Sequence, residues 1–252
     1  MNMQSNKPRS RGIYLLPNLF TIGSSFAGFF SIIAAFNGHY DTSAIAIFIA
    51  MIMDSLDGRV ARLTNTMTDF GAQFDSLTDM VSFAVAPAFL AYTWSLSTLG
   101  KFGWLAAFIY MVAVTLRLAR FNTQLGASDK RYFQGIPCPA AAAVVTSFIW
   151  ICYDFGFANN LASIILSALM ILVGVLMVSN IRFRSFKDAE FKNHVRFVVI
   201  LIAVLVIALL TFDPSKVLFI VFIVYAASGP IATILGLRQK KRMRKQAMKT
   251  KA

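Results

Sequence analysis

The chain has 252 residues, of which 58% are hydrophobic and only 14% are charged, and its mean hydropathy is +0.67. An ordinary soluble domain carries about 25% charged residues, so this composition excludes one and indicates a polytopic membrane protein. The formal net charge of +13 is strongly basic, which requires either a polyanionic partner or a membrane topology that gathers cations on one side.

Apolar segments long enough to cross a hydrocarbon core of about 30 Å follow one another along nearly the whole chain. In chain order, the predicted membrane helices cover 17–37, 42–63, 71–96, 102–123, 137–157, 160–180, 196–212 and 216–236. About eight helices predict an all-α membrane bundle. The sequence shows no internal repeat and leaves no room for a separate soluble domain.

The basic residues are distributed unevenly along these predicted helices. If both termini lie inside, all but Lys101 and Lys216 of the 24 Lys and Arg residues fall on the inner side. Cytoplasmic loops of membrane proteins collect Lys and Arg, so we expect both termini in the cytoplasm and no nucleic-acid partner. The basic segment 238–251 is expected to bind anionic lipid head groups, at about 1 kcal/mol per Lys or Arg close to the surface.

Four aspartates interrupt two consecutive apolar segments. Asp54 and Asp57 end one predicted helix, and Asp75 and Asp79 begin the next. Spacings of three and four residues place each pair on one helical face, and the short connection brings the two faces together near the cytoplasmic end. An ionised carboxylate at the centre of a membrane helix costs roughly 2.5–3.5 kcal/mol, so the cluster needs compensating positive charge. Oxygen ligands suit hard divalent cations, and the sequence predicts two ions, Mg²⁺ or Mn²⁺.

A single aspartate near a helix end can simply cap the helix or pair with an arginine. Capping or pairing does not explain the whole set, because five of the 11 acidic residues are concentrated within 54–79. The fifth, Asp69, is expected to be a helix cap or a surface charge. Gly58 and Gly71 lack a Cβ and allow close approach to the backbone, and Ala61 keeps the same wall thin. The planar guanidinium of Arg62 suits phosphate oxygens.

These residues form one spaced motif, Asp54-x2-Asp57-Gly58-x2-Ala61-Arg62-x8-Gly71-x3-Asp75-x3-Asp79. The motif resembles the complete signature of the CDP-alcohol phosphotransferase family. The resemblance implies a core of six membrane helices, usually dimeric, that transfers a phosphatidyl group from a CDP-linked lipid to an alcohol and releases CMP.

The resemblance also implies roles for individual residues. Asp54, Asp57 and Asp75 match positions that ligate divalent metal, and Asp79 matches the position that helps to hold the second ion and acts as general base. The positions expected to contact the CDP-lipid are Gly58, Ala61, Arg62, Gly71, Asn18 and Thr21. A helix cap is an alternative for Asn18. The chemistry agrees, because displacement at a diphosphate needs its charge neutralised and a hydroxyl nucleophile needs a base.

Segments outside the motif resemble the bacterial branch of the family that uses L-serine as the acceptor. They cover residues 17–21, 117–122, 133–140 and 179–187. Serine carries a carboxylate, which needs a fixed cation. The candidates for binding the acceptor or the lipid phosphate are Arg117, Arg120, Asn122, Arg182, Arg184 and Lys187. Arginines at a cytoplasmic helix end also commonly extend toward head groups without binding substrate.

The sequence therefore predicts a metal-dependent transferase of the cytoplasmic (inner) membrane, a homodimer that makes phosphatidylserine from CDP-diacylglycerol and L-serine. The alternatives are phosphatidylglycerophosphate synthase or another CDP-alcohol phosphotransferase, and, in a different class, a cation transporter, since intramembrane carboxylates also mark ion pathways. We expect the catalytic membrane domain at 1–190, two additional helices at 191–237 and a basic cytoplasmic tail at 238–252.

Overall fold

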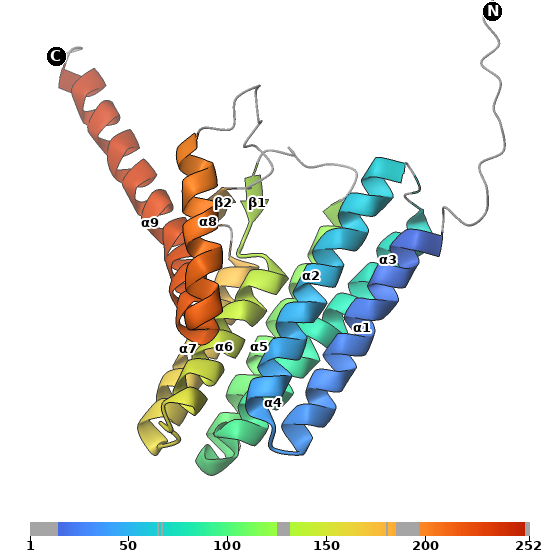
Figure 1. Cartoon of the computed structure of the whole chain (residues 1–252). Coiled ribbons are helices and arrows are strands. Elements are labelled where there is room, and N and C mark those ends of the chain that lie inside the picture. The colour runs from blue at the N-terminus through green and yellow to red at the C-terminus, as the bar shows by residue number, and fades with distance from the viewer. Residues whose placement is uncertain are drawn as a thin grey trace, which may run out of the picture.

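The computed structural model of the chain describes residues 15–64, 66, 68–124, 132–179, 181–184 and 197–249. The helices are α1 (Leu15–Phe36), α2 (Tyr40–Thr64), α3 (Asp69–Asp79), η2 (Met80–Val85), α4 (Ala86–Trp94), η3 (Leu96–Leu99), α5 (Lys101–Gln124), α6 (Cys138–Asp154), α7 (Asn160–Val178), α8 (Phe197–Phe212) and α9 (Pro214–Lys249). The segments α3, η2 and α4 follow one another without a break and form one long helix. The long helices lie side by side in one bundle (Figure 1). This confirms the predicted all-α membrane helix bundle.

Length and composition support a membrane location for most of this bundle. In the described part of the chain, five helical stretches are long and apolar enough to cross a membrane: Pro17–Phe36, Asp69–Trp94, Lys101–Thr123, Asn160–Val178 and Pro214–Thr233. The apolar helix α6 is shorter. Large hydrophobic side chains such as Phe26, Phe102 and Leu161 are exposed on the bundle surface, as expected where a protein faces lipid. The chain is therefore a multi-pass membrane protein.

Small side chains allow the helices of the bundle to pack closely. Four consecutive buried alanines, 140–143, lie on α6. Between α1 and α2, the hydroxyls of Ser31 and Ser43 are 2.8 Å apart, and Ser24 Oγ donates to the carbonyl oxygen of Ala50 at 3.1 Å. Small residues and interhelical hydrogen bonds are what hold helices together in lipid, where there is little hydrophobic drive for association.

Two short strands were not predicted from the sequence. β1 (Tyr132–Gln134) follows α5 and β2 (Arg182–Arg184) follows α7, and they pair antiparallel with Phe133 opposite Phe183. Runs of three residues are too short to show the alternating pattern by which strands are recognised. The pair joins two loops at one end of the bundle (Figure 1).

The last helix is longer than the predicted span 216–236 and continues to Lys249. Beyond Gly236 the sequence contains no Gly or Pro and is rich in Lys, Arg, Gln, Met and Ala, which are good helix formers. In its membrane segment, α9 packs through aromatic rings, with Phe219 5.9 Å from Phe148 and Phe222 6.1 Å from Phe48 between ring centroids.

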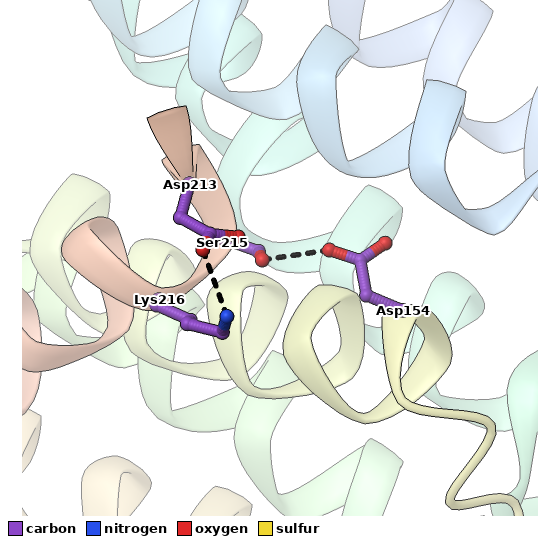
Figure 2. Close-up of polar contacts among 4 residues, drawn as sticks. All are labelled: Asp154, Asp213, Ser215 and Lys216. Atoms are coloured by element: carbon purple, nitrogen blue, oxygen red, sulfur yellow. Dashed lines mark hydrogen bonds and ion pairs between the residues drawn. The ribbon is translucent and has the colours of Figure 1, made fainter. Parts of the chain in front are cut away.

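The two ends of the bundle differ in character. The start of α1, the end of α9 and both strands lie at one end (Figure 1). At the opposite end, Ser215 Oγ donates to Asp154 Oδ2 at 2.7 Å and Lys216 Nζ pairs with Asp213 Oδ2 at 2.8 Å (Figure 2). The first of these contacts ties the start of α9 to the last residue of α6.

Candidate metal and nucleotide site

The junction between α2 and α3 brings the four aspartates of the motif together. Thr68 is the N-cap of α3, and its Oγ1 accepts a hydrogen bond from the Gly71 backbone N–H at 3.0 Å. This cap starts α3 directly after the turn, so that α3 runs back alongside α2. Asp69 lies exposed in the first turn of α3; it is a surface charge, and Thr68 provides the cap.

The carboxylates meet inside the bundle, some distance along the helices from the turn that joins α2 and α3. One carboxylate oxygen from each of Asp54, Asp57 and Asp75 lies within 4.8 Å of the other two. The side chain of Asp79 lies against that of Asp54 and completes the group. At 1.5 Å per residue, Asp79 is about 15 Å along the helix from Asp69, and Asp57 is about 10 Å from the end of α2. The cluster therefore lies about two to three helical turns inside the bundle.

The cluster has the unsatisfied acceptors that a cation needs. Asp75 Oδ1 and Asp79 Oδ1 are buried and have no hydrogen-bond partner among the described residues. Nor does any Lys or Arg in the described ranges form an ion pair with the four aspartates. Buried carboxylates are normally paired or bound to metal, so oxygen donors at this spacing suit a hard divalent cation.

Helix α1 orients one of these carboxylates. Thr21 is buried, and its Oγ1 donates to Asp57 Oδ2 at 2.9 Å, with the carbonyl oxygen of Pro17 at 3.1 Å. Asp57 is the most buried of the four aspartates, at 5% exposure. The family resemblance implies that Thr21 contacts the CDP-lipid, which stays a prediction; the structure shows that its hydroxyl bonds to a candidate metal ligand.

The small residues of the motif leave space next to the carboxylates. Among the described atoms, a Cβ on Gly58 would have only Arg62 Nη2 near it, at 4.0 Å, which leaves the backbone there open to a ligand. A Cβ on Gly71 would lie 3.1 Å from Thr68 Oγ1 and 3.8 Å from Asn18 Oδ1, so this position is close to α1. Asn18 lies inside α1 and does not cap that helix. Ala61 is half-buried and Arg62 is exposed in the last turn of α2.

Two candidate acceptor residues on α5 point into the bundle. Arg117 Nη1 donates to the Sγ of Cys138 at 3.1 Å, while its buried Nε has no hydrogen-bond partner among the described residues. Asn122 Nδ2 donates to Ser76 Oγ at 3.0 Å, which connects α5 to the residue after Asp75. The structure thus brings Asn122 to the carboxylate helix as a hydrogen-bonding partner.

The other candidate cations are Arg120, which contacts the end of α7, and three residues whose side chains are outside the described part of the chain. Arg120 Nη1 donates to the carbonyl oxygen of Val178 at 3.4 Å. Arg182 and Arg184 are on β2, with only their backbone described, and Lys187 is outside the described residues.

Sequence reasoning missed two residues of this region, Ser76 and Cys138. Ser76 follows Asp75 inside the motif, and the motif spacing does not indicate its hydrogen bond to Asn122 of α5. Cys138 stands between two prolines at the start of α6 and is fully buried against Arg117. Nothing in its local sequence indicated that neighbour.

Comparison with known proteins identifies related chains. Residues 14–179 match the family described as CDP-alcohol phosphatidyltransferase. The chain is 36% identical over 213 residues to a CDP-diacylglycerol–serine O-phosphatidyltransferase of Helicobacter pylori (strain ATCC 700392 / 26695), covering 84% of this chain and 90% of the relative. It is 32% identical over 237 residues to an enzyme of the same name from Mycobacterium leprae (strain TN), covering 90% and 78%.

Two further similar proteins are named for other lipid products. An archaetidylserine synthase of Methanothermobacter thermautotrophicus (strain ATCC 29096 / DSM 1053 / JCM 10044 / NBRC 100330 / Delta H) is 34% identical over 180 residues, covering 71% of this chain and 73% of that one. A solved structure of Mycobacterium tuberculosis phosphatidylinositol phosphate synthase with CDP-DAG bound aligns with a TM-score of 0.49 at 22% identity, covering 66% and 80%.

Proposed function

Because the chain belongs to the CDP-alcohol phosphatidyltransferase family, we propose that it transfers the phosphatidyl group of CDP-diacylglycerol to the hydroxyl of L-serine. The products are phosphatidylserine and CMP. The observation that carries the proposal is the convergence of Asp54, Asp57, Asp75 and Asp79, with two buried oxygens that lack a partner in the described chain. The choice of serine is supported by relatives that are named as serine transferases and that the chain matches over most of their length.

The aspartates divide into two roles. Asp54, Asp57 and Asp75 would hold a divalent cation, and Asp79 would share in holding a second; Mg²⁺ and Mn²⁺ both suit oxygen ligands. When bound, such ions neutralise the charge of a diphosphate. Thr21 fixes the orientation of the Asp57 carboxylate, and the open backbone at Gly58 leaves space for the nucleotide next to Arg62.

Asp79 serves as the general base. Its Oδ1 has no partner among the described residues and can accept the proton of the serine hydroxyl. The serine oxygen then forms a bond to the phosphorus of the phosphatidyl group, the bond from that phosphorus to the CMP oxygen breaks, and CMP leaves as the anion.

Location and assembly follow from the same reasoning. If both termini lie inside, the predicted topology puts all but two of the Lys and Arg residues on the inner side together with the aspartates, which supports a cytoplasmic active site in the inner membrane. We propose a homodimer, residues 1–190 as the catalytic domain, 191–237 as two additional helices and 238–252 as a basic tail that faces anionic lipid. The resemblance to the family supports the dimer and the division into a core and added helices.

An acceptor assay tests the proposed function. Purified protein in detergent is supplied with CDP-diacylglycerol, Mn²⁺ and either labelled L-serine or labelled glycerol 3-phosphate. We expect labelled lipid and CMP only with serine. Incorporation of glycerol 3-phosphate alone would show that glycerol 3-phosphate, and not serine, is the acceptor. Cation flux into sealed vesicles without any lipid product would show that the protein is a transporter and not a transferase.

We expect Arg117 to bind the carboxylate of serine. Its guanidinium lies in the bundle, where the buried Nε has no partner within the described ranges, and it donates otherwise to a thiol, which is a weak acceptor. Hydrogen bonds to charged groups contribute about 1.5–3 kcal/mol, so Arg117→Gln should raise the KM for serine about 10- to 100-fold. The KM for CDP-diacylglycerol should stay unchanged.

The matched control for this variant removes a cation from the opposite end of the same helix. Lys101 is exposed at the first residue of α5, and Lys101→Gln should leave both KM values unchanged. An Arg117→Gln enzyme whose serine KM matches the wild type would show that Arg117 only packs against Cys138.

A further inference from the structure

We infer that Tyr110 is a positioning residue for the proposed reaction. It stabilises a π-helical turn directly after Asp79, and this turn sets the angle at which Asp75 and Asp79 face α2. The inference rests on the proposed function, because its effect is measured at the carboxylates. It concerns a part of the bundle that lies outside the aspartate motif.

The π turn has an identifiable cause in the sequence. In the helix from Asp69 to Trp94, the Met80 N–H still bonds to the carbonyl of Ser76, four residues earlier, whereas the Ala86 N–H bonds to the carbonyl of Val81, five residues earlier. Pro87 follows directly. In an α-helix its ring would clash with the carbonyl four residues before it, at Phe83, and it has no N–H to donate to that carbonyl. A wider turn avoids the clash but leaves the Phe83 carbonyl without its α-helical donor.

Tyr110 supplies the missing donor. Its side chain is fully buried on α5, and its Oη donates to the carbonyl oxygen of Phe83 at 2.8 Å. In a bundle that faces lipid, no water replaces a lost donor, so this hydroxyl is what makes the wide turn acceptable. Helix α7 holds α5 close behind it, since a Cβ on Gly174 would lie 3.7 Å from the Tyr110 Cα.

The opposite side of the same turn is fixed to α1. Ser82 Oγ donates to the carbonyl oxygen of Ser24 at 3.0 Å. A Cβ on Gly28 would lie 2.5 Å from Ser82 Oγ and 2.8 Å from the Ser82 Cα, so α1 and the turn are in direct backbone contact. About one turn before Ser24 on α1, Thr21 donates to Asp57. The turn is thus clamped between α5 and the helix that orients a candidate metal ligand.

The turn matters to the site because it changes the phase of the helix. A π turn takes up an extra residue, so it rotates everything before it relative to everything after it. The half after the turn is locked in the core by buried residues such as Ala86, Leu90 and Ala91. If the turn relaxed to regular α-helix, the half with Asp75 and Asp79 would have to rotate, and the two carboxylates would turn away from Asp54 and Asp57.

The test compares two isosteric variants. Tyr110→Phe removes only the hydroxyl that bonds to Phe83. Tyr40→Phe is the matched control, because Tyr40 Oη donates to the carbonyl oxygen of Thr93 at 3.1 Å, at the end of the same long helix that is distant from Asp79. Mn²⁺ binding is measured by electron paramagnetic resonance on purified protein, alongside kcat and the Tm.

We expect Tyr110→Phe to weaken Mn²⁺ binding and lower kcat by about tenfold each, the size of effect that an orphaned buried acceptor produces. Tyr40→Phe should keep Mn²⁺ affinity and kcat at wild-type values, even if its Tm falls by as much as that of Tyr110→Phe. A Tyr110→Phe protein with wild-type Mn²⁺ binding would overturn the positioning role. Wild-type protein that binds no Mn²⁺ would overturn the proposed function, and this inference with it.

A second variant keeps the inference testable if Tyr110→Phe folds poorly. Pro87→Ala restores an N–H that can reach the Phe83 carbonyl and removes the ring clash, so the helix can close to a regular α-helix. We expect this variant to be stable but to lose Mn²⁺ affinity and kcat as Tyr110→Phe does. Adding Tyr110→Phe to it should change little more, because Phe83 then has its own donor. Full activity of Pro87→Ala would show that the turn does not set the carboxylate angle.

Discussion

Replacing Asp79 with asparagine is expected to lower the rate of phosphatidylserine formation by about 10³-fold, within the range that a general base contributes. The amide cannot take the proton of the serine hydroxyl. It also replaces a carboxylate oxygen that, among the described residues, has no hydrogen-bond partner and is free to bind a cation. Asparagine has nearly the same shape, so α3 and the bundle should stay intact, and the Tm of the purified protein should remain close to that of the wild type.

The control for this variant is Asp69→Asn. Asp69 is on the same helix, three turns away, and its side chain is exposed in the first turn. Its loss should leave kcat and KM unchanged. Asp79→Asn enzyme that kept more than a tenth of the wild-type rate at saturating serine would contradict the assignment of Asp79 as base.

Removing divalent metal is expected to stop the reaction. Neutralisation of a diphosphate is worth several kcal/mol, and each 1.36 kcal/mol is tenfold in rate, so an excess of EDTA should lower turnover by about 10²-fold or more. Adding Mn²⁺ or Mg²⁺ beyond the chelator should restore it. The measurement is release of CMP from CDP-diacylglycerol with serine present.

Chelator that has been saturated with Mg²⁺ beforehand provides the control, because it exposes the protein to the same molecule without removing metal. It should leave turnover unchanged. Elemental analysis after chelation establishes how much metal remains on the protein. Undiminished turnover by protein shown to be metal-free would mean that Asp54, Asp57 and Asp75 serve some other purpose.

The sequence allowed the bundle and the carboxylate cluster to be predicted because both depend on local spacing. Apolar runs of fixed length predict membrane helices, and aspartates three and four residues apart must share a helical face. The short connection between α2 and α3 then leaves little choice about where the two faces meet. The same local rules explain why Thr68, in the variable stretch of the motif before Gly71, starts α3.

Features that depend on distant parts of the chain were not predictable in this way. The wide turn before Pro87 depends on Tyr110, which donates to the carbonyl oxygen of Phe83 from 27 residues away in the sequence. The contact between Ser76 and Asn122 spans 46 residues, and that between Thr21 and Asp57 spans 36. The pairing of β1 with β2 joins two loops whose sequences carry no strand pattern. Each of these contacts is a consequence of how the helices pack.

The depth of the carboxylates, two to three turns inside the bundle, places the chemistry at the boundary between two solvents. The acyl chains of CDP-diacylglycerol can stay in hydrocarbon while its cytidine reaches upward to water, and serine needs to descend only a short way from the aqueous phase. Neither reactant has to be extracted from the medium it dissolves in. Each product is likewise released where it is soluble, with the new lipid already in the leaflet and CMP already beside the aqueous phase.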